Sequence, residues 1–205
     1  MRRKINYSIS KISKLRLETQ MSDKNFSEEF IGEPSLAQLR ADFRQSETLG
    51  MPIAGAIVWS AFGILALFIA EETMATIALY IMFPILGLAY FIEKLRGKNL
   101  FGERNNNPLI KLFLLSVLAV ALIVPFAVIS SRASDPNLMV LGMAVLSGIV
   151  WIFYGWAADD PSGVQHAIIR ATGCYAAYSL LPVSFQVSAM CAVVVVCYIY
   201  SLAKK

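Results

Sequence analysis

The residues best suited to chemistry lie in the last quarter of the chain, where residues 159–161 (Asp-Asp-Pro) precede His166 and Arg170. In a helix over residues 161–181, His166 and Arg170 are four positions apart and share one face. Arg170 follows the proline by nine residues, or about 10 to 14 Å of helix. A cation at the centre of a membrane helix costs about 2.5 to 3.5 kcal/mol to insert. The sequence therefore predicts a neighbouring group that offsets this charge.

Two interpretations of this region remain open. In the first, Arg170 holds an anionic group in a polar pocket that faces the cytoplasm, and His166 changes its charge near neutral pH beside it. Glu93 is then the best charged partner, because it ends the second apolar segment on the same side and at a similar depth, and Asp159 is the next candidate. In the second, Arg170 extends to the membrane interface beside a half-exposed His166, and Asp160 only caps a helix.

Common catalytic and nucleotide-binding motifs are absent from the sequence. It contains no HExxH, GxSxG, Walker or GxGxxG pattern and a single histidine. Its three cysteines, Cys174, Cys191 and Cys197, form no CxxC pair and are expected to be small buried apolar residues. We therefore expect no metal site, no cofactor and no catalytic residues, and an enzyme would have to work from within the apolar segments.

The elements that must position these residues are apolar helices. Hydrophobic residues make up 57% of the chain and charged residues 16%, whereas a soluble domain carries about 25% charged residues. A helix of about 20 apolar residues is long enough to cross a bilayer. The sequence predicts an all-α, polytopic bundle of six transmembrane helices, of which the fifth is the most polar. These spans cover residues 51–70, 74–92, 108–130, 136–157, 161–181 and 184–202.

Lysine and arginine are concentrated on one side of such a bundle. Residues 1–50 contain nine of them, residues 94–111 contain five, and the chain ends with Lys204 and Lys205, whereas the opposite side holds only Arg132. Since cytoplasmic segments carry the excess of Lys and Arg, both ends are predicted to be cytoplasmic. We expect a multi-pass protein of the plasma (inner) membrane.

One short helix is expected ahead of the first span. A serine and a glutamine three residues apart could form a capping box, and apolar residues then recur at helical spacing. This pattern predicts an amphipathic helix over residues 34–48, which lies either on the membrane surface or on the bundle. Residues 1–33 show no apolar period and are expected to be disordered.

The net charge of +4 does not predict nucleic-acid binding. Residues 1–20 alone contribute +5, from six Lys or Arg and one Glu. Met21 is a plausible alternative start, and the chain without residues 1–20 has a net charge of −1. A basic stretch of this kind could also lie on anionic lipid.

Prolines are expected both to start and to bend spans. Pro84 and Pro125 interrupt the second and third spans, and each is predicted to kink its helix. Three other prolines follow an Asn or Asp, a pairing typical of helix starts, because the Asx side chain accepts from the first turn and proline needs no partner at N1. These pairs are Asn107 with Pro108, Asp135 with Pro136, and Asp160 with Pro161.

Small residues line one face of the first span and one face of the fourth, where they allow close approach of helices. Packing inside one chain is the default expectation, and a homo-oligomer is the alternative. The two faces consist of Ala56, Ser60 and Gly63, and of Ala144, Gly148 and Gly155.

Several short segments resemble one protein family. Residues 39–43 (Leu-Arg-Ala-Asp-Phe), then residues 50–52 (Gly-Met-Pro), leading to Trp59, are similar to the opening of a family of small, uncharacterised bacterial membrane proteins. Residues 107–109 (Asn-Pro-Leu), and His166 with Arg170, are similar to its later segments. The resemblance covers residues 35–203 and is consistent with a start at Met21. It implies six helices in a bacterial plasma membrane and no particular activity.

The function that these features favour is binding or permeation of a small solute, possible partners being the lipid bilayer and a small anion held at Arg170. A non-catalytic membrane scaffold that binds a partner or forms an oligomer is the alternative, and a membrane-embedded enzyme ranks third. The two leading functions differ in the surroundings of Arg170. A binding protein predicts one cavity lined by Arg170, His166 and Glu93, whereas a scaffold predicts a closed core and an arginine that reaches water.

Overall fold

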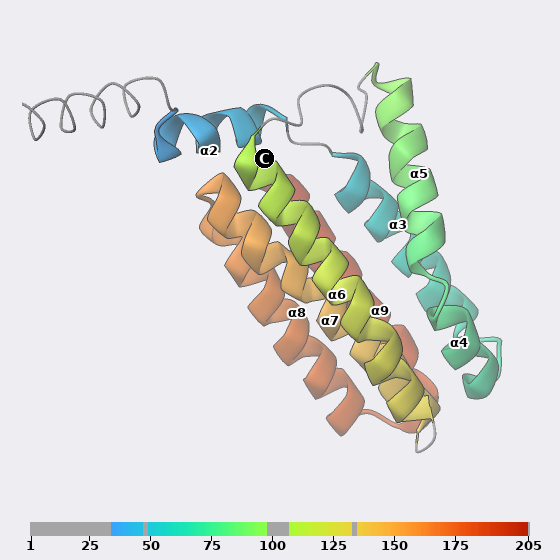
Figure 1. The fold of residues 1–205 in the computed structure, drawn as a ribbon. Helices are drawn as coiled ribbons and strands as arrows, with labels where there is room; N and C mark the ends of the chain where they lie inside the picture. Colours follow the sequence, from blue (N-terminus) through green and yellow to red (C-terminus); the bar gives the residue numbers. More distant parts are fainter. Residues whose placement is uncertain (1–33, 47–48, 98–106, 133–134, 205) are drawn as a thin grey trace, which may run out of the picture. The chain divides into compact units, whose positions relative to one another are not determined.

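The computed structural model describes residues 34–46, 49–97, 107–132 and 135–204, with only the backbone described at residues 82 and 124–132. Within these ranges the chain forms eight α-helices, labelled α2 to α9 in Figure 1, and no strand. The chain divides into two compact units, Met1–Gln38 and Leu39–Lys205. The second unit contains the helices described below, apart from the first turn of α2. Residues 1–33, predicted to be disordered, lie outside the described ranges.

Three helices begin with the local chemistry that the sequence predicts. They are α6 (Pro108–Arg132), α7 (Pro136–Ala158) and α8 (Pro161–Leu180). In each of them a preceding Asx side chain accepts a hydrogen bond from the backbone N–H two residues later. The accepting oxygens belong to Asn107, Asp135 and Asp160, and the N–O distances are 2.9, 2.8 and 2.8 Å. The predicted role of Asp160 as a helix cap is therefore confirmed.

The predicted amphipathic helix is α2 (Leu36–Gln45), and the capping box forms between Ser35 and Gln38. Its buried residue, Phe43, packs edge-on against Phe113 with 5.9 Å between ring centroids. Phe43 thereby joins an apolar cluster with the first turn of α6 and the last turn of α7. The part of α2 that lies in the second unit is thus docked on the bundle, which was one of the two predicted placements.

The second predicted span is broken. Its two pieces are α4 (Glu71–Ala78) and α5 (Met82–Leu95), which are bent by 52° at the break. Pro84 lies in the first turn of α5, where its missing N–H costs no helical hydrogen bond, so the bend occurs where this proline predicts one. The predicted kink at Pro125 stays a prediction, since α6 is assigned as one helix through that position.

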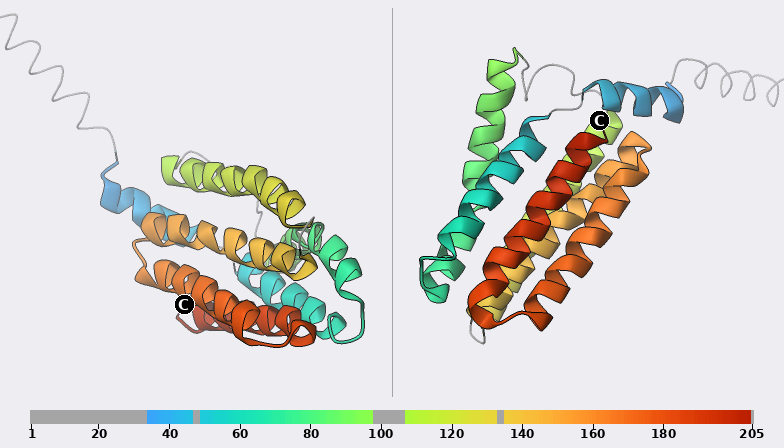
Figure 2. Two further views of the ribbon diagram at one scale, coloured as in Figure 1. Left: turned by 90° about the horizontal axis from the view of Figure 1, so that it is seen from below. Right: turned by 180° about the vertical axis from the view of Figure 1, so that it is seen from behind.

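The remaining helices are α3 (Gly50–Leu65) and α9 (Val183–Ala203). In Figures 1 and 2, α6, α7, α8 and α9 run side by side, while α3, α4 and α5 lie to one side of them. The packed pairs follow this arrangement: α7 contacts α6, α8, α9 and α4, α9 also contacts α8 and α3, and α5 packs on α3. Helices α3, α7 and α9 therefore enclose the centre.

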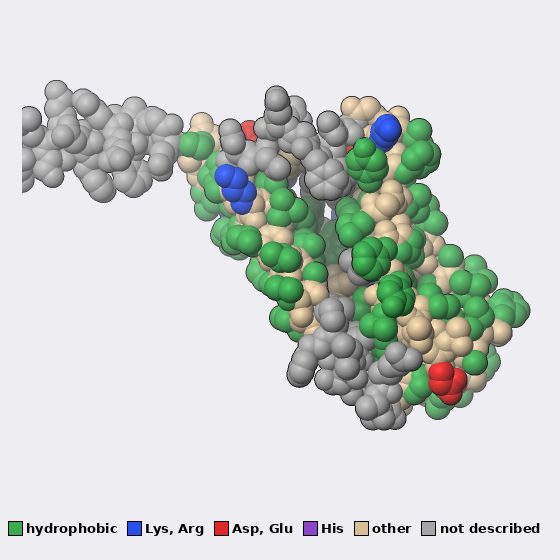
Figure 3. All heavy atoms as spheres, turned by 45° about the vertical axis from the view of Figure 1, so that its right-hand side comes forward, with side chains coloured by type: hydrophobic (Ala, Val, Ile, Leu, Met, Phe, Trp, Pro, Cys, Tyr) green, Lys and Arg blue, Asp and Glu red, His purple; other side chains and the backbone are tan. Residues whose placement is uncertain are grey.

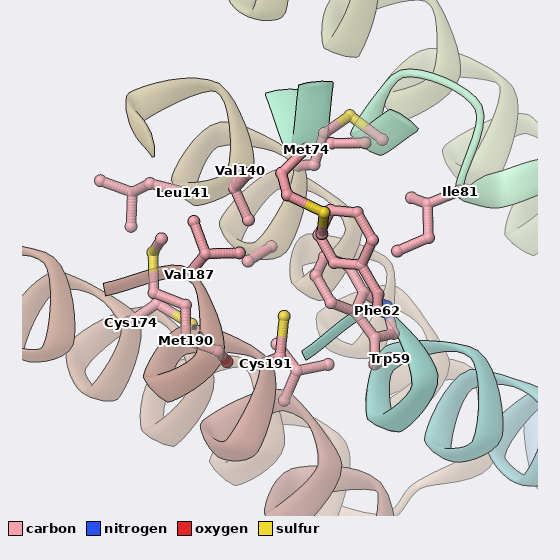
Figure 4. Close-up of a cluster of buried hydrophobic side chains, with 14 of the residues drawn as sticks. Trp59, Phe62, Met74, Ile81, Val140, Leu141, Cys174, Val187, Met190 and Cys191 are labelled. Atoms are coloured by element: carbon pink, nitrogen blue, oxygen red, sulfur yellow. Dashed lines mark hydrogen bonds between the residues drawn. The ribbon is translucent and has the colours of Figure 1, made fainter. Parts of the chain in front are cut away.

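An apolar cluster fills this centre, with large side chains such as Trp59, Phe62 and Met74 in contact with one another (Figure 4). The two predicted small-residue faces serve packing inside the chain. A Cβ added at Gly63 would lie 2.7 Å from Cys191 Cβ, and one added at Gly155 would lie 3.2 Å from the Cα of Gly163. These glycines let α3 approach α9 and let α7 approach α8, as the packing interpretation predicts. Association of two chains stays a prediction.

The number of membrane spans is confirmed only in part. Among the described helices, α7 and α9 are individually long and apolar enough to cross a bilayer. The count reaches four if each of two bent pairs, α2 with α3 and α4 with α5, forms one span. Helix α8, which carries Gln165, His166 and Arg170, is not in this group. The protein is thus all-α with two to four candidate spans, and six spans remain a prediction.

Candidate functional site

Arg170 lies in the middle of α8 and is completely buried. Its Nε donates to the carbonyl oxygen of Ala144 at 2.7 Å, and its Nη2 donates to Ser147 Oγ at 2.6 Å. Both acceptors belong to α7. The interpretation in which Arg170 extends to the membrane interface is therefore wrong, because neighbouring backbone and hydroxyl oxygens hold the side chain inside.

Aromatic rings flank the guanidinium of Arg170. Its Cζ lies 5.6 Å from the ring centroid of Trp59 in α3 and 5.4 Å from that of Tyr198 in α9. Each such cation–π contact contributes about 0.5 to 2 kcal/mol. Neither ring provides a negative charge, so these contacts reduce the cost of burying the cation without neutralising it.

Two glycines make room for this arrangement. A Cβ added at Gly148 in α7 would lie 3.0 Å from Arg170 Cδ, and one added at Gly55 in α3 would lie 2.4 Å from Tyr198 Cζ. The absence of side chains at these positions lets Arg170 cross the face of α7 and lets the Tyr198 ring approach α3 closely. Gly148, proposed from the sequence as a packing residue, thus also shapes the site.

His166 lies beside Arg170 and is also completely buried. Its ring stacks on Trp151, with 4.1 Å between centroids and 13° between planes, and its Nδ1 lies 2.7 Å from Ser201 Oγ. The Tyr198 ring, which touches Arg170, is also 5.4 Å from the His166 ring. The structure thus brings together the two residues that the sequence singled out, joined by Tyr198.

Three buried nitrogens in this cluster have no hydrogen-bond partner within the described part of the chain: Arg170 Nη1, His166 Nε2 and Trp59 Nε1. The arginine and tryptophan atoms are donors only, and the histidine atom is a donor or an acceptor depending on its tautomer. A buried polar group without a partner costs about 1 to 3 kcal/mol, and more when it is charged. The cluster therefore has unused capacity for hydrogen bonds to an anion.

Glu93 is not the partner of Arg170, and the predicted pairing is wrong. The Glu93 carboxylate is buried, and its Oε1 accepts from Gly50 N at 2.6 Å and pairs with Arg96 at 2.9 Å. It thereby caps the start of α3, where a negative charge is favourable. The other oxygen, Oε2, has no partner among the described residues. The pairing fails because α5 packs on α3 and not on α8.

Asp159 also binds a different arginine. It ends α7 with a left-handed backbone, φ 56°, and its exposed carboxylate pairs with Arg40 of α2 at 2.9 Å. Beside it, Arg44 Nη1 donates to the carbonyl oxygen of Ala158 at 2.8 Å. These contacts fasten α2 to the end of α7. Among the residues that the structure describes, no carboxylate forms an ion pair with Arg170.

The match to a protein family covers most of the chain. Residues 36–204 match the model of a family described as a family of unknown function (DUF7010). The chain belongs to this family. Its membership agrees with the predicted uncharacterised family and nearly with the predicted range. No curated protein and no solved structure matches the chain.

The DUF7010 match includes every residue around Arg170. This Arg170 cluster consists of Trp59, Ser147, Trp151, His166, Arg170, Tyr198 and Ser201. The neighbours that shape this site were not predicted from the sequence. A pattern within each helix could have suggested some of them, because Ser147 and Trp151 are four apart in α7 and Tyr198 and Ser201 are three apart in α9. They were missed because aromatic residues in membrane segments are usually assigned to interfaces or to packing.

The chemistry available to this DUF7010 protein at Arg170 is binding. Over the described ranges, no group of three or more His, Cys, Asp or Glu residues could hold a metal ion. The cluster offers N–H donors, one fixed positive charge and aromatic walls. This combination can hold an anion and exclude water from it.

Proposed function

We propose that this DUF7010 protein is a six-span protein of the bacterial inner membrane, with both ends in the cytoplasm, that binds a small anionic solute at Arg170. Permeation of that solute is the extension of this proposal. Arg170 is the tenth of the 20 residues of α8, so the site lies at mid-depth if α8 spans the membrane. Binding sites of transporters commonly lie at this depth.

The distribution of charge supports the proposed orientation. Arg40, Arg44 and Arg96 lie at one end of the second unit, where they contact Asp159, the end of α7 and Glu93. The same end contains the start of α3, which Glu93 caps. Basic residues gathered at one end are typical of the cytoplasmic side of a membrane protein.

The observation that carries the proposal is a buried arginine without an anion. Arg170 has no exposed surface, its two hydrogen bonds go to neutral oxygens, and its Nη1 is free in the described part of the chain. Burial of an uncompensated charge costs several kcal/mol. A bound anion would supply the missing charge and accept from Nη1.

Anion-dependent stability tests this function. Purified protein in neutral detergent is unfolded by heat in sodium salts of acetate, octanoate, nitrate and phosphate at equal ionic strength. We expect at least one anion to raise the Tm of the unaltered chain and not that of Arg170→Gln. Arg40→Gln, which removes a partly buried arginine that pairs with Asp159 and lies outside the Arg170 site, is the matched control and should respond to anions like the unaltered chain. Equal responses of all three proteins would remove the anion site.

The scaffold alternative makes the opposite prediction. Arg170 does not reach water, as the scaffold prediction required. In a scaffold with a buried arginine, its hydrogen bonds would serve only to join α7 and α8, and no anion would affect stability through it. The closed apolar core around Trp59 is the observation that favours this alternative. The salt series above separates the two functions without knowledge of the natural ligand.

A further inference from the structure

The second unit has a cleft on the side where α5 lies. Helix α5 packs on α3, and α6 packs on α7, so these two pairs form opposite walls. Figure 3 shows the surface hollowed between α5 and α6, with hydrophobic side chains along both sides. Residues 83–92 of α5 and 112–123 of α6, whose side chains the structure describes, contain no charged residue. The walls of the cleft are therefore apolar.

Contacts of Arg170 place its guanidinium where the two walls meet. It lies over the Trp59 ring of α3, the helix that carries α5, and it donates to Ser147 of α7, the helix that carries α6. Ser147 and Trp151 are partly buried, whereas Gly148 beside them is fully buried against α8. This side of α7 is thus only partly covered, and the buried cation lies directly behind it.

The remaining donors of Arg170 fit a carboxylate. Nε and one N–H of Nη2 are occupied by α7, which leaves the edge formed by Nη1 and the second N–H of Nη2. Two N–H groups on one edge of a guanidinium match the two oxygens of a carboxylate. Among the described residues, no carboxylate pairs with Arg170. The single negative charge of one bound carboxylate would therefore neutralise the single positive charge of Arg170.

We propose that the anion is the carboxylate of a single-chain amphiphile, such as a fatty acid, whose hydrocarbon chain lies in the cleft between α5 and α6. This inference rests on the proposed function and specifies its ligand. A hydrated anion would have to cross an apolar surface to reach Arg170. An amphiphile in the bilayer can instead enter the apolar cleft directly from the surrounding lipid. Each methylene group raises the partition of the amphiphile into the bilayer, and thereby its concentration beside the cleft.

Tryptophan fluorescence tests this ligand class, because two of the three tryptophans, Trp59 and Trp151, lie in the Arg170 cluster. The third, Trp156, is half-exposed beside Arg40 and is replaced by phenylalanine in the reporter protein. Stearate with a nitroxide at carbon 5 or at carbon 16 is added to this protein in nanodiscs of phosphatidylcholine. A nitroxide near the carboxylate should quench more strongly, because the carboxylate lies beside Trp59.

Competition and substitution identify the binding group. Unlabelled stearate should reverse the quenching, and methyl stearate, which lacks the charge, should not. Arg170→Gln should weaken binding by about tenfold or more. Arg170→Lys keeps the charge and loses the planar edge, so its affinity should fall between the two. The lysine variant also keeps the test decisive if the glutamine variant fails to fold.

The outcomes separate this inference from the function on which it rests. If acetate or inorganic phosphate competes as well as stearate, the anion site stands and the amphiphile is excluded. If labelled stearate quenches equally in the unaltered reporter and in both Arg170 variants, its carboxylate does not bind there and the inference is wrong. If, in addition, no salt changes Tm through Arg170, the proposed function falls as well.

Discussion

Replacement of Arg170 by methionine distinguishes a ligand-binding arginine from a structural one. Methionine keeps an unbranched side chain that can fill much of the same space and removes the buried charge. Two hydrogen bonds and two cation–π contacts are lost, but the cost of burying the cation disappears with them. Replacements of buried charges by apolar side chains are often neutral or stabilising.

The groups left behind decide the magnitude. Ser147 Oγ still donates to the carbonyl oxygen of Met143 at 2.6 Å. The carbonyl oxygen of Ala144 lies inside α7, where the helix supplies its own donor. No buried polar atom on α7 becomes isolated, so we expect Arg170→Met to change the free energy of unfolding by less than about 2 kcal/mol without an anion. Breaking a fully satisfied buried charge pair would instead cost about 3 to 5 kcal/mol.

The anion response then separates the two proteins. A ligand at 100 times its Kd stabilises by about 2.7 kcal/mol, which for a chain of this size raises Tm by about 5 to 11 °C. The unaltered chain should show this rise and Arg170→Met should not. The assay is thermal unfolding in neutral detergent, followed by tryptophan fluorescence, with and without octanoate.

Two results would contradict this reasoning. A methionine variant that loses 3 kcal/mol or more without any anion would show that Arg170 is needed for the fold itself. A methionine variant that gains as much from octanoate as the unaltered chain would show that the anion binds elsewhere.

Three further predictions concern packing and topology. Glu93→Ala leaves the Gly50 N–H unsatisfied and should cost about 1 to 3 kcal/mol in thermal unfolding, whereas Glu93→Gln keeps an acceptor and should cost less. Gly148→Ala pushes against Arg170 and should reduce the octanoate-induced rise in Tm. Gly142→Ala, at a glycine of the same helix with nothing within 4 Å, is its control and should be neutral or stabilising by about 1 kcal/mol. With six spans, a fluorescent protein fused after residue 205 should fluoresce in the bacterial cytoplasm, and alkaline phosphatase at the same point should be inactive.

Each of these has a clear contrary result. Equal Tm values for Glu93→Ala and the unaltered chain would show that the start of α3 does not need its cap. An octanoate response that is the same in Gly148→Ala and Gly142→Ala would show that the position of the Arg170 side chain does not matter. Active phosphatase at the C-terminus would mean that this end lies outside the cytoplasm, which contradicts the proposed orientation.

Local chemistry made the helix starts predictable. Asp135 and Asp160 each precede a proline, and both cap the next helix as expected. The bend near Pro84 was predictable for the same reason, because a proline N atom cannot donate whatever surrounds it. These features depend on a few consecutive residues, so the sequence contains all the necessary information.

The surroundings of Arg170 could be predicted only in part. Its place on one face with His166 follows from helical spacing, but Trp59 and Tyr198 come from helices far away in the chain, and contacts between helices decide their positions. Glu93 illustrates the limit. Arg96, three residues later, was visible as a local partner, yet depth alone favoured Arg170, because the order in which helices pack was not known.

Both hydrogen-bond acceptors of Arg170 belong to α7, which is joined to α8 by Asp159 and Asp160 alone. This arrangement bears on how such a chain is inserted during synthesis. Helix α8 is too polar to enter a bilayer readily by itself, but the hairpin of α7 and α8 carries the acceptors for its own arginine. The glycine contact between the two helices, Gly155 with Gly163, closes this hairpin near its turn. If α8 spans the membrane as proposed, α7 and α8 can therefore leave the translocation machinery as one unit, with both hydrogen-bond acceptors of Arg170 in place before α9 has been made.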